Sequence, residues 1–185
     1  MKKSFFSLAL ISSLFAVAAT ATAGDFSTSY VQAQYADMGD NIDGTSIKGS
    51  VAFGGTGLYL SGEYSKFDVE AAGVDLKESV VLLGYQKNVS NAVALFGEAG
   101  YYQVDVGGFD ADGYQAGVGA RFAAGKYFEP YVKVAYTDVD EIGGATEGTI
   151  GTLIKPWSHV GIIAQYSFGE DSNADLWKAG VRFSW

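Results

Sequence analysis

Apolar and polar residues alternate along nearly the whole chain after residue 24. The alternation is plainest at the C-terminus, where a polar residue stands between each pair of apolar ones in the series Trp177, Ala179, Val181, Phe183 and Trp185. A period of two is typical of a β-strand with one apolar and one polar face. No stretch after residue 24 has helical periodicity or an apolar run long enough for a spanning helix. The pattern predicts an all-β protein.

Ten such segments can be distinguished, separated by clusters of Gly, Asp, Asn and Ser. The predicted strands cover residues 26–36, 45–53, 58–67, 77–87, 92–103, 113–122, 127–137, 147–155, 159–168 and 175–185. Short turns are expected after the second, fourth, sixth and eighth strands. The other connections are expected to be longer and mostly acidic, at 37–44, 68–76, 104–112, 138–146 and 169–173. An even number of antiparallel strands places both termini at the same end, so the short turns are expected there.

The polar face of these strands carries ions at mid-strand, namely Lys48, Glu63, Glu98, Lys133 and Lys178. The core of a soluble barrel rarely holds such residues. Facing lipid at the membrane midplane, each Lys or Arg would cost about 2 to 4 kcal/mol. We therefore expect the ions to face inward and the apolar residues to face lipid, in a closed antiparallel up-and-down transmembrane β-barrel. Ten strands are favoured; eight is the alternative if one hairpin belongs to a long loop.

Aromatic residues on the predicted outer face lie mostly near strand ends, where amphipathic rings settle at the two membrane interfaces. The ones expected to point outward are Tyr35, Tyr64, Tyr85, Tyr101, Tyr114, Phe122, Phe128, Tyr136, Phe168 and Trp185. The general strand propensity of aromatics explains their number but not these positions.

The first 23 residues have the pattern of a secretory signal peptide. Lys2 and Lys3 precede an apolar run over 5–19, and the segment ends with Ala21-Thr22-Ala23. The run is shorter than the roughly 20 residues of a spanning helix, which disfavours an N-terminal membrane anchor. We expect cleavage after Ala23 and one mature barrel domain over 24–185. Loss of the two lysines changes the formal net charge from −9 to −11, which argues against a nucleic-acid partner.

With this signal peptide, its Gly- and Tyr-rich hairpins and its terminal aromatic, the chain resembles the small outer-membrane β-barrel proteins of Gram-negative bacteria. It is most similar to the OmpX/Ail-type proteins and the OmpA transmembrane domain. In that class the barrel-assembly machinery recognises the last strand, and Trp177, Val181, Phe183 and Trp185 match its pattern. The resemblance implies outer-membrane lipid and lipopolysaccharide as surroundings. The chain differs from that class in the number of strands, since those barrels usually have eight. The sequence does not indicate the oligomeric state.

Charged residues of both signs are expected to meet in the lumen and to pair across it. The predicted lumen charge network consists of Lys48, Glu63, Glu98, Arg121, Glu129, Lys133, Lys178 and Arg182. A barrel of about eight strands is just filled by side chains, and ten strands add modest room. We interpret the network as a plug that also determines strand register, with a narrow path for ions as the alternative.

No arrangement of residues indicates catalysis, a cofactor or a metal site. The single histidine, His159, follows a short turn and is expected at the periplasmic rim. The segments 41–44 and 110–113 each match half of a calcium-binding loop but lack its first and last ligands. We therefore predict a non-enzymatic protein with a structural or surface role. A narrow porin-like pore is the alternative, and an adhesin is the second.

Overall fold

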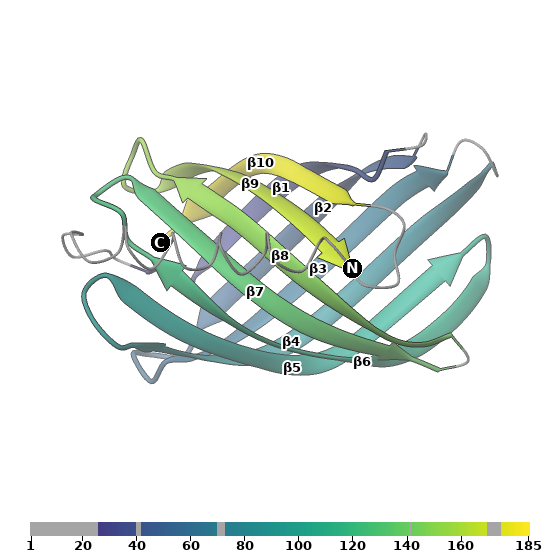
Figure 1. Ribbon diagram of the computed structural model, residues 1–185, viewed down its shortest axis with the longest axis horizontal. Coiled ribbons are helices and arrows are strands. Elements are labelled where there is room, and N and C mark those ends of the chain that lie inside the picture. Colours follow the sequence, from purple (N-terminus) through teal and green to yellow (C-terminus); the bar gives the residue numbers. More distant parts are fainter. Residues whose placement is uncertain (1–25, 40–41, 70–72, 141, 170–174) are drawn as a thin grey trace, which may run out of the picture.

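The computed structural model of the chain describes residues 26–39, 42–69, 73–140, 142–169 and 175–185. It has ten β-strands, coloured along the chain in Figure 1. Their bounds are β1 Tyr30–Asp37, β2 Ile42–Ala52, β3 Leu58–Val69, β4 Val74–Asn88, β5 Val93–Val106, β6 Phe109–Phe122, β7 Phe128–Val139, β8 Gly143–Ile154, β9 Val160–Gly169 and β10 Leu176–Ser184.

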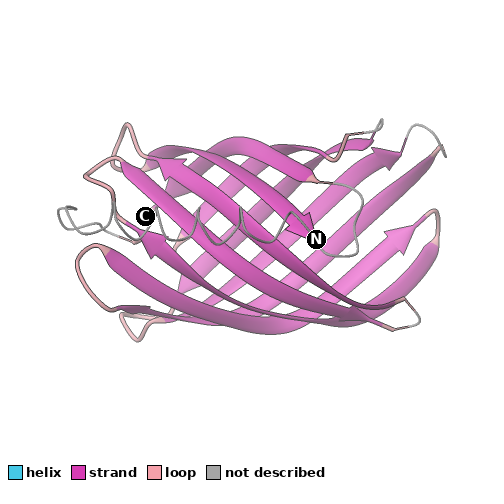
Figure 2. Cartoon of the chain, viewed as in Figure 1, coloured by secondary structure: helices cyan, strands magenta, loops and turns pink. Residues whose placement is uncertain are grey.

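The strands form one closed sheet in which each strand pairs antiparallel with its neighbours in the sequence (Figures 1 and 2). The ring closes between β1 and β10, which pair from Tyr30 opposite Ser184 to Asp37 opposite Trp177. Closure satisfies the backbone groups that an open sheet would leave exposed at its edges. The prediction of a ten-stranded antiparallel barrel is confirmed, and the eight-stranded alternative is wrong. None of the described residues forms a helix long and apolar enough to cross a membrane.

The two faces of the barrel wall differ in the predicted sense. Large apolar side chains on the outside are exposed, for example Val118 at 66% and Ile47 at 60%. Lys178 and Arg182, by contrast, are 7% and 9% exposed. In β4, where both faces are apolar in part, Leu83 points outward and is exposed while Leu82 is buried. The protein is thus apolar outside and charged inside.

Most of the aromatic residues expected on the outer face are found there. Eight of the ten are exposed, whereas Phe168 is partly buried and Phe122 is buried. Tyr101 donates a hydrogen bond to Asp112, and Tyr114 and Tyr136 lie with their ring centroids 6.3 Å apart. These tyrosines lie towards the end of the barrel opposite the chain's C-terminus.

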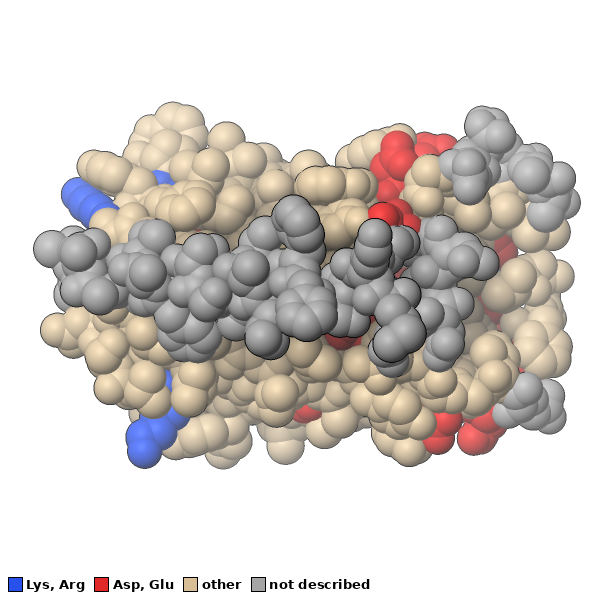
Figure 3. All heavy atoms as spheres, viewed as in Figure 1, with Lys and Arg blue, Asp and Glu red and all other residues tan. Residues whose placement is uncertain are grey.

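Four of the long acidic loops predicted at that end, 37–44, 68–76, 104–112 and 138–146, are wrong in length, because the strands continue into them. The fifth, 169–173, lies mostly outside the described residues. Strands β5 and β6 pair as far as Val106 opposite Phe109, so only Gly107 and Gly108 connect them. Both glycines have positive φ, 60° and 92°, which side-chain-bearing residues rarely adopt. The aspartates predicted to end the strands instead pair across the hairpin, since carboxylates in water do not prevent strand pairing. Figure 3 shows acidic residues gathered at this end and basic ones at the other.

The proposed signal peptide, residues 1–23, lies outside the described residues.

Candidate functional site

The barrel interior brings together charged residues from strands far apart in the sequence. The first group is centred on Glu63 of β3, which lies between Lys48 of β2 and Lys178 of β10. Lys178 Nζ is 2.8 Å from Glu63 Oε1, and Lys48 Nζ is 3.3 Å from Oε2. One carboxylate is therefore shared by two ammonium groups.

A second group joins β5 to β7 across β6. Lys133 Nζ lies 2.5 Å from Glu98 Oε1, and the hydroxyl of Tyr59 donates to Glu98 Oε2 at 3.0 Å. Both oxygens of Glu98 are thus occupied, one by a cation and one by a neutral donor. Such charge-assisted hydrogen bonds are stronger than neutral ones.

The third group lies near the end of the barrel that holds the C-terminus. Arg121 Nε donates to Glu129 Oε1 at 2.7 Å, and Lys155 Nζ donates to Oε2 at 3.0 Å. Glu129 is only 2% exposed. Lys155 was not among the predicted lumen residues. It is the last residue of a predicted strand and precedes the turn at Pro156, where the alternation of apolar and polar residues ends and no longer indicates which face a side chain lies on.

Arg182 has a different environment from the other lumen cations. Its Nε and Nη2 donate to Gln32 Oε1 at 2.9 and 2.7 Å, and its guanidinium lies 3.9 Å from the centroid of the Tyr30 ring. Within the described part of the chain, no carboxylate forms an ion pair with it. A neutral amide and an aromatic face therefore hold this buried charge in place.

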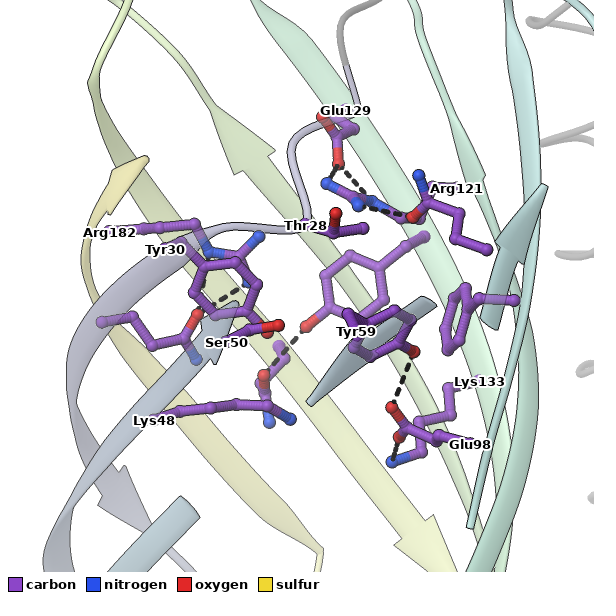
Figure 4. A pocket seen from close by; sticks show the side chains of 15 residues that line it. Thr28, Tyr30, Lys48, Ser50, Tyr59, Glu98, Arg121, Glu129, Lys133 and Arg182 are labelled. Atoms are coloured by element: carbon purple, nitrogen blue, oxygen red, sulfur yellow. Dashed lines mark hydrogen bonds and ion pairs between the residues drawn. The ribbon is translucent and has the colours of Figure 1, made fainter. Parts of the chain in front are cut away.

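A cavity of about 90 Å³ lies among these groups in the lumen. Figure 4 shows charged and hydroxyl-bearing side chains converging on it from several strands. Its lining includes Lys48, Arg121, Lys133 and Arg182 as cations and Glu98 and Glu129 as anions. Since a water needs roughly 10 to 15 Å³ of such volume, there is room for several waters or a small ion.

Residues 26–29 were predicted to begin the first strand, but β1 starts at Tyr30. Instead this segment enters the barrel, where Phe26 is 5% exposed and packs with Ala94 and Ala123. Arg121 Nη1 donates to the carbonyl of Ser27 at 3.0 Å, and Gln86 Nε2 donates to that of Phe26 at 3.1 Å. These contacts hold the segment inside the wall, while Ser29 at its end still accepts a hydrogen bond from the backbone N–H of Trp185 at 3.2 Å. The segment lies in the lumen near this end, where Thr28 lines the cavity.

Towards the opposite end of the lumen, apolar side chains gather on the inner wall of β4 to β7. Val104, Ala111 and Val139 form a buried cluster against which Leu76 and Tyr102 pack. The hydroxyl of Tyr102 donates to Glu78 at 2.8 Å. Sequence reasoning missed this cluster because it assigned four of its five residues to connecting segments. The apolar alternation inside those segments was the signal that could have revealed it.

The remaining predicted residues lie on the rim or the outer face. His159 is exposed, with Nδ1 2.9 Å from the carbonyl oxygen of Ser184 beside the C-terminus. Among the described residues, no group of three His, Cys, Asp or Glu side chains is placed to hold a metal ion. Four residues of the predicted assembly signal point outward and are about half exposed or more: Trp177, Val181, Phe183 and Trp185.

Comparison with known proteins gives the fold but no family. No family model and no curated protein sequence matches the chain. Among solved structures, the KdgM porin superposes with a TM-score of 0.53 at 11% identity, covering 84% of this chain and 99% of that one. The NanC porin gives a TM-score of 0.53 at 10% identity, covering 85% and 100%. At this identity the likeness shows a shared barrel fold, and the closer resemblance to OmpX/Ail-type proteins stays a prediction.

Proposed function

We propose that this chain is an integral outer-membrane β-barrel whose lumen is closed by its own residues and whose role is structural or at the cell surface. The proposal rests on how side chains are distributed across the barrel wall, with exposed apolar residues outside and paired ions inside. In lipid the outer face loses no hydrogen bonds, and the ions avoid a cost of several kcal/mol each. The shared fold with porins supports the same location.

Two further parts of the chain are given roles by this proposal. Residues 1–23 would direct export and be removed, leaving the barrel domain 24–185. The outward aromatic residues of β10 would be recognised by the barrel-assembly machinery during insertion into a membrane that contains lipopolysaccharide. The proposed role is non-enzymatic and needs no cofactor. Because only two glycines connect β5 to β6, little surface is available there for an adhesin.

A narrow pore for ions is the second candidate function. Two observations favour a pore: the cavity is polar, and the segment 26–29 is held in the lumen by hydrogen bonds and packing that can break. The KdgM porin has also been solved in complex with disordered oligogalacturonate, and that structure superposes with a TM-score of 0.51. A cavity of about 90 Å³ has no room for a sugar chain, so a pore through this lumen would pass ions only.

Single-channel conductance of the mature chain 24–185 in a planar bilayer separates the two candidates. Insertion is first verified by the heat-dependent shift of the folded band on a gel. The closed barrel predicts no steady conductance from inserted protein. It also predicts that Phe26→Ala combined with Arg121→Gln, which releases the segment 26–29, raises conductance, whereas the exposed Lys87→Gln does not. Steady conductance of the unaltered chain would contradict the closed lumen and favour the pore.

A further inference from the structure

The lumen cavity is more positive than the rest of the protein. Four cations and two carboxylates line it, although the whole chain carries a formal net charge of −9. Both lining carboxylates are already engaged. Glu98 binds Lys133 and Tyr59, and Glu129 binds Arg121 and Lys155. The two remaining cations of the lining, Lys48 and Arg182, are therefore not neutralised by them.

Neither of these two cations has a carboxylate of its own. Lys48 shares Glu63 with Lys178, which is the closer of the two to it. Arg182 donates to Gln32 through Nε and Nη2, and within the described residues its Nη1 forms no hydrogen bond. Two further carboxylates on the inward face, Glu78 and the exposed Glu147, accept from the neutral hydroxyls of Tyr102 and Thr149, and among the described residues neither forms an ion pair with Lys48 or Arg182. A buried cation that has no carboxylate of its own is costly without a counter-ion.

Strand register brings the two cations to the same place. Gln32 of β1 pairs with Arg182 of β10 on one side and with Lys48 of β2 on the other. The three side chains form a row across neighbouring strands, with cross-strand Cβ separations of roughly 5 Å. Both charged ends of the row line the cavity, and Figure 4 shows them on the same side of it.

A hydroxyl beside this row lacks a partner. Ser50 lies two residues after Lys48 on the same face of β2, lines the cavity and is 3% exposed. Its Oγ makes no hydrogen bond with any described residue. Buried hydroxyls without a partner are uncommon, because each loses its bonds to water. A ligand that accepts hydrogen bonds in the cavity would satisfy Ser50 and offset the charge of Arg182 and Lys48 together.

We propose that the lumen cavity binds a small inorganic anion of halide type between Arg182, Lys48 and Ser50. The chemistry of the site supplies donors and positive charge. Its volume of about 90 Å³ admits a halide with a few waters but excludes larger organic anions. The site is independent of the proposed function, since an anion held here would stabilise a closed barrel and would equally influence ion passage in an open one.

Bromide and gluconate, one small and one large anion, distinguish binding from a general salt effect. The thermal midpoint of the refolded mature chain is measured in detergent while sodium bromide replaces sodium gluconate at constant ionic strength. Binding to the folded state predicts a saturable rise in the midpoint. Arg182→Gln should abolish the rise, and Ser50→Ala should weaken apparent affinity about fivefold, as expected for one hydrogen bond. Lys87→Gln, an exposed control, should leave the rise unchanged.

The proposal is overturned if the midpoint of the unaltered chain does not rise, or if Arg182→Gln shows the same saturable rise. Should Arg182→Gln not refold, Ser50→Ala and Lys48→Gln provide the comparison. Crystals grown in bromide give a direct readout, because anomalous scattering locates the ion. A peak between Arg182 and Lys48 supports the site, and peaks confined to the protein surface contradict it.

Discussion

The two ends of the lumen are lined by different kinds of side chain, although the same ten strands surround both. At the end near the C-terminus, Arg121, Glu129 and Lys155 form an ion network that also holds the segment 26–29. Towards the other end, an apolar cluster around Val104 and Val139 lies on the inner wall. Strand β7 contributes to both, with Glu129 near its start and Val139 at its end.

This difference has an energetic consequence. An apolar cluster loses stability gradually, in proportion to the surface and volume removed. A buried ion network loses much more when one partner is removed, because the remaining charge is left without compensation. Side chains at one end of β7 should therefore tolerate truncation far better than those at the other.

The largest effect is expected from Glu129→Ala. The change leaves Arg121 and Lys155 without their carboxylate in a buried position, at a cost of about 3 to 5 kcal/mol in the free energy of unfolding. Urea unfolding in lipid vesicles, followed by tryptophan fluorescence, measures it. Asp110→Ala, an exposed carboxylate of the opposite end, is the matched control and should change little. Equal losses for both variants would show that the inner network contributes no particular stability.

A smaller effect is expected from Val139→Ala at the far end of the same strand. Removing two methyl groups from a side chain that is 8% exposed should cost about 1 to 2 kcal/mol in the same unfolding measurement. Ten residues of strand separate the two positions, or about 33 Å. The double variant with Glu129→Ala should therefore show additive losses. A strongly non-additive result would mean that the ion network and the apolar cluster are coupled along the lumen.

The smallest effect is expected from Lys66→Gln in the exposed part of β3. Lys66 Nζ is 3.1 Å from Asp75 and 3.5 Å from Asp68, but all three side chains are well exposed. Water and salt screen such pairs, so no measurable change in unfolding is expected. Repeating the measurement at low and high NaCl tests the screening. A loss at high salt comparable to that of Glu129→Ala would contradict this distinction between exposed and buried pairs.

The fold was predictable because lipid and lumen impose opposite requirements on alternate residues. Ile47 and Val118 alternate with polar residues and were predicted outside, and Lys48 and Lys133 were predicted inside, so the face of most strands could be derived from period. The count of ten strands also depended on the turn residues between them, and it left eight strands as an alternative. Strand ends were less predictable. Acidic residues such as Asp105 and Asp110 were interpreted as loop signals, yet beyond the membrane a strand can continue with either face in water.

By itself, the sequence determined which residues of the central part of most strands face inward, since a period of two leaves each side chain only one of two faces. Only the tertiary structure decided which of them meet. Arg121 pairs with Glu129 and Lys155, while Arg182 is left with Gln32. These partners depend on strand tilt, register and ring closure, which set positions across the lumen between residues as far apart in sequence as Glu63 and Lys178. Alternation along one strand carries no information about the residues on the opposite wall.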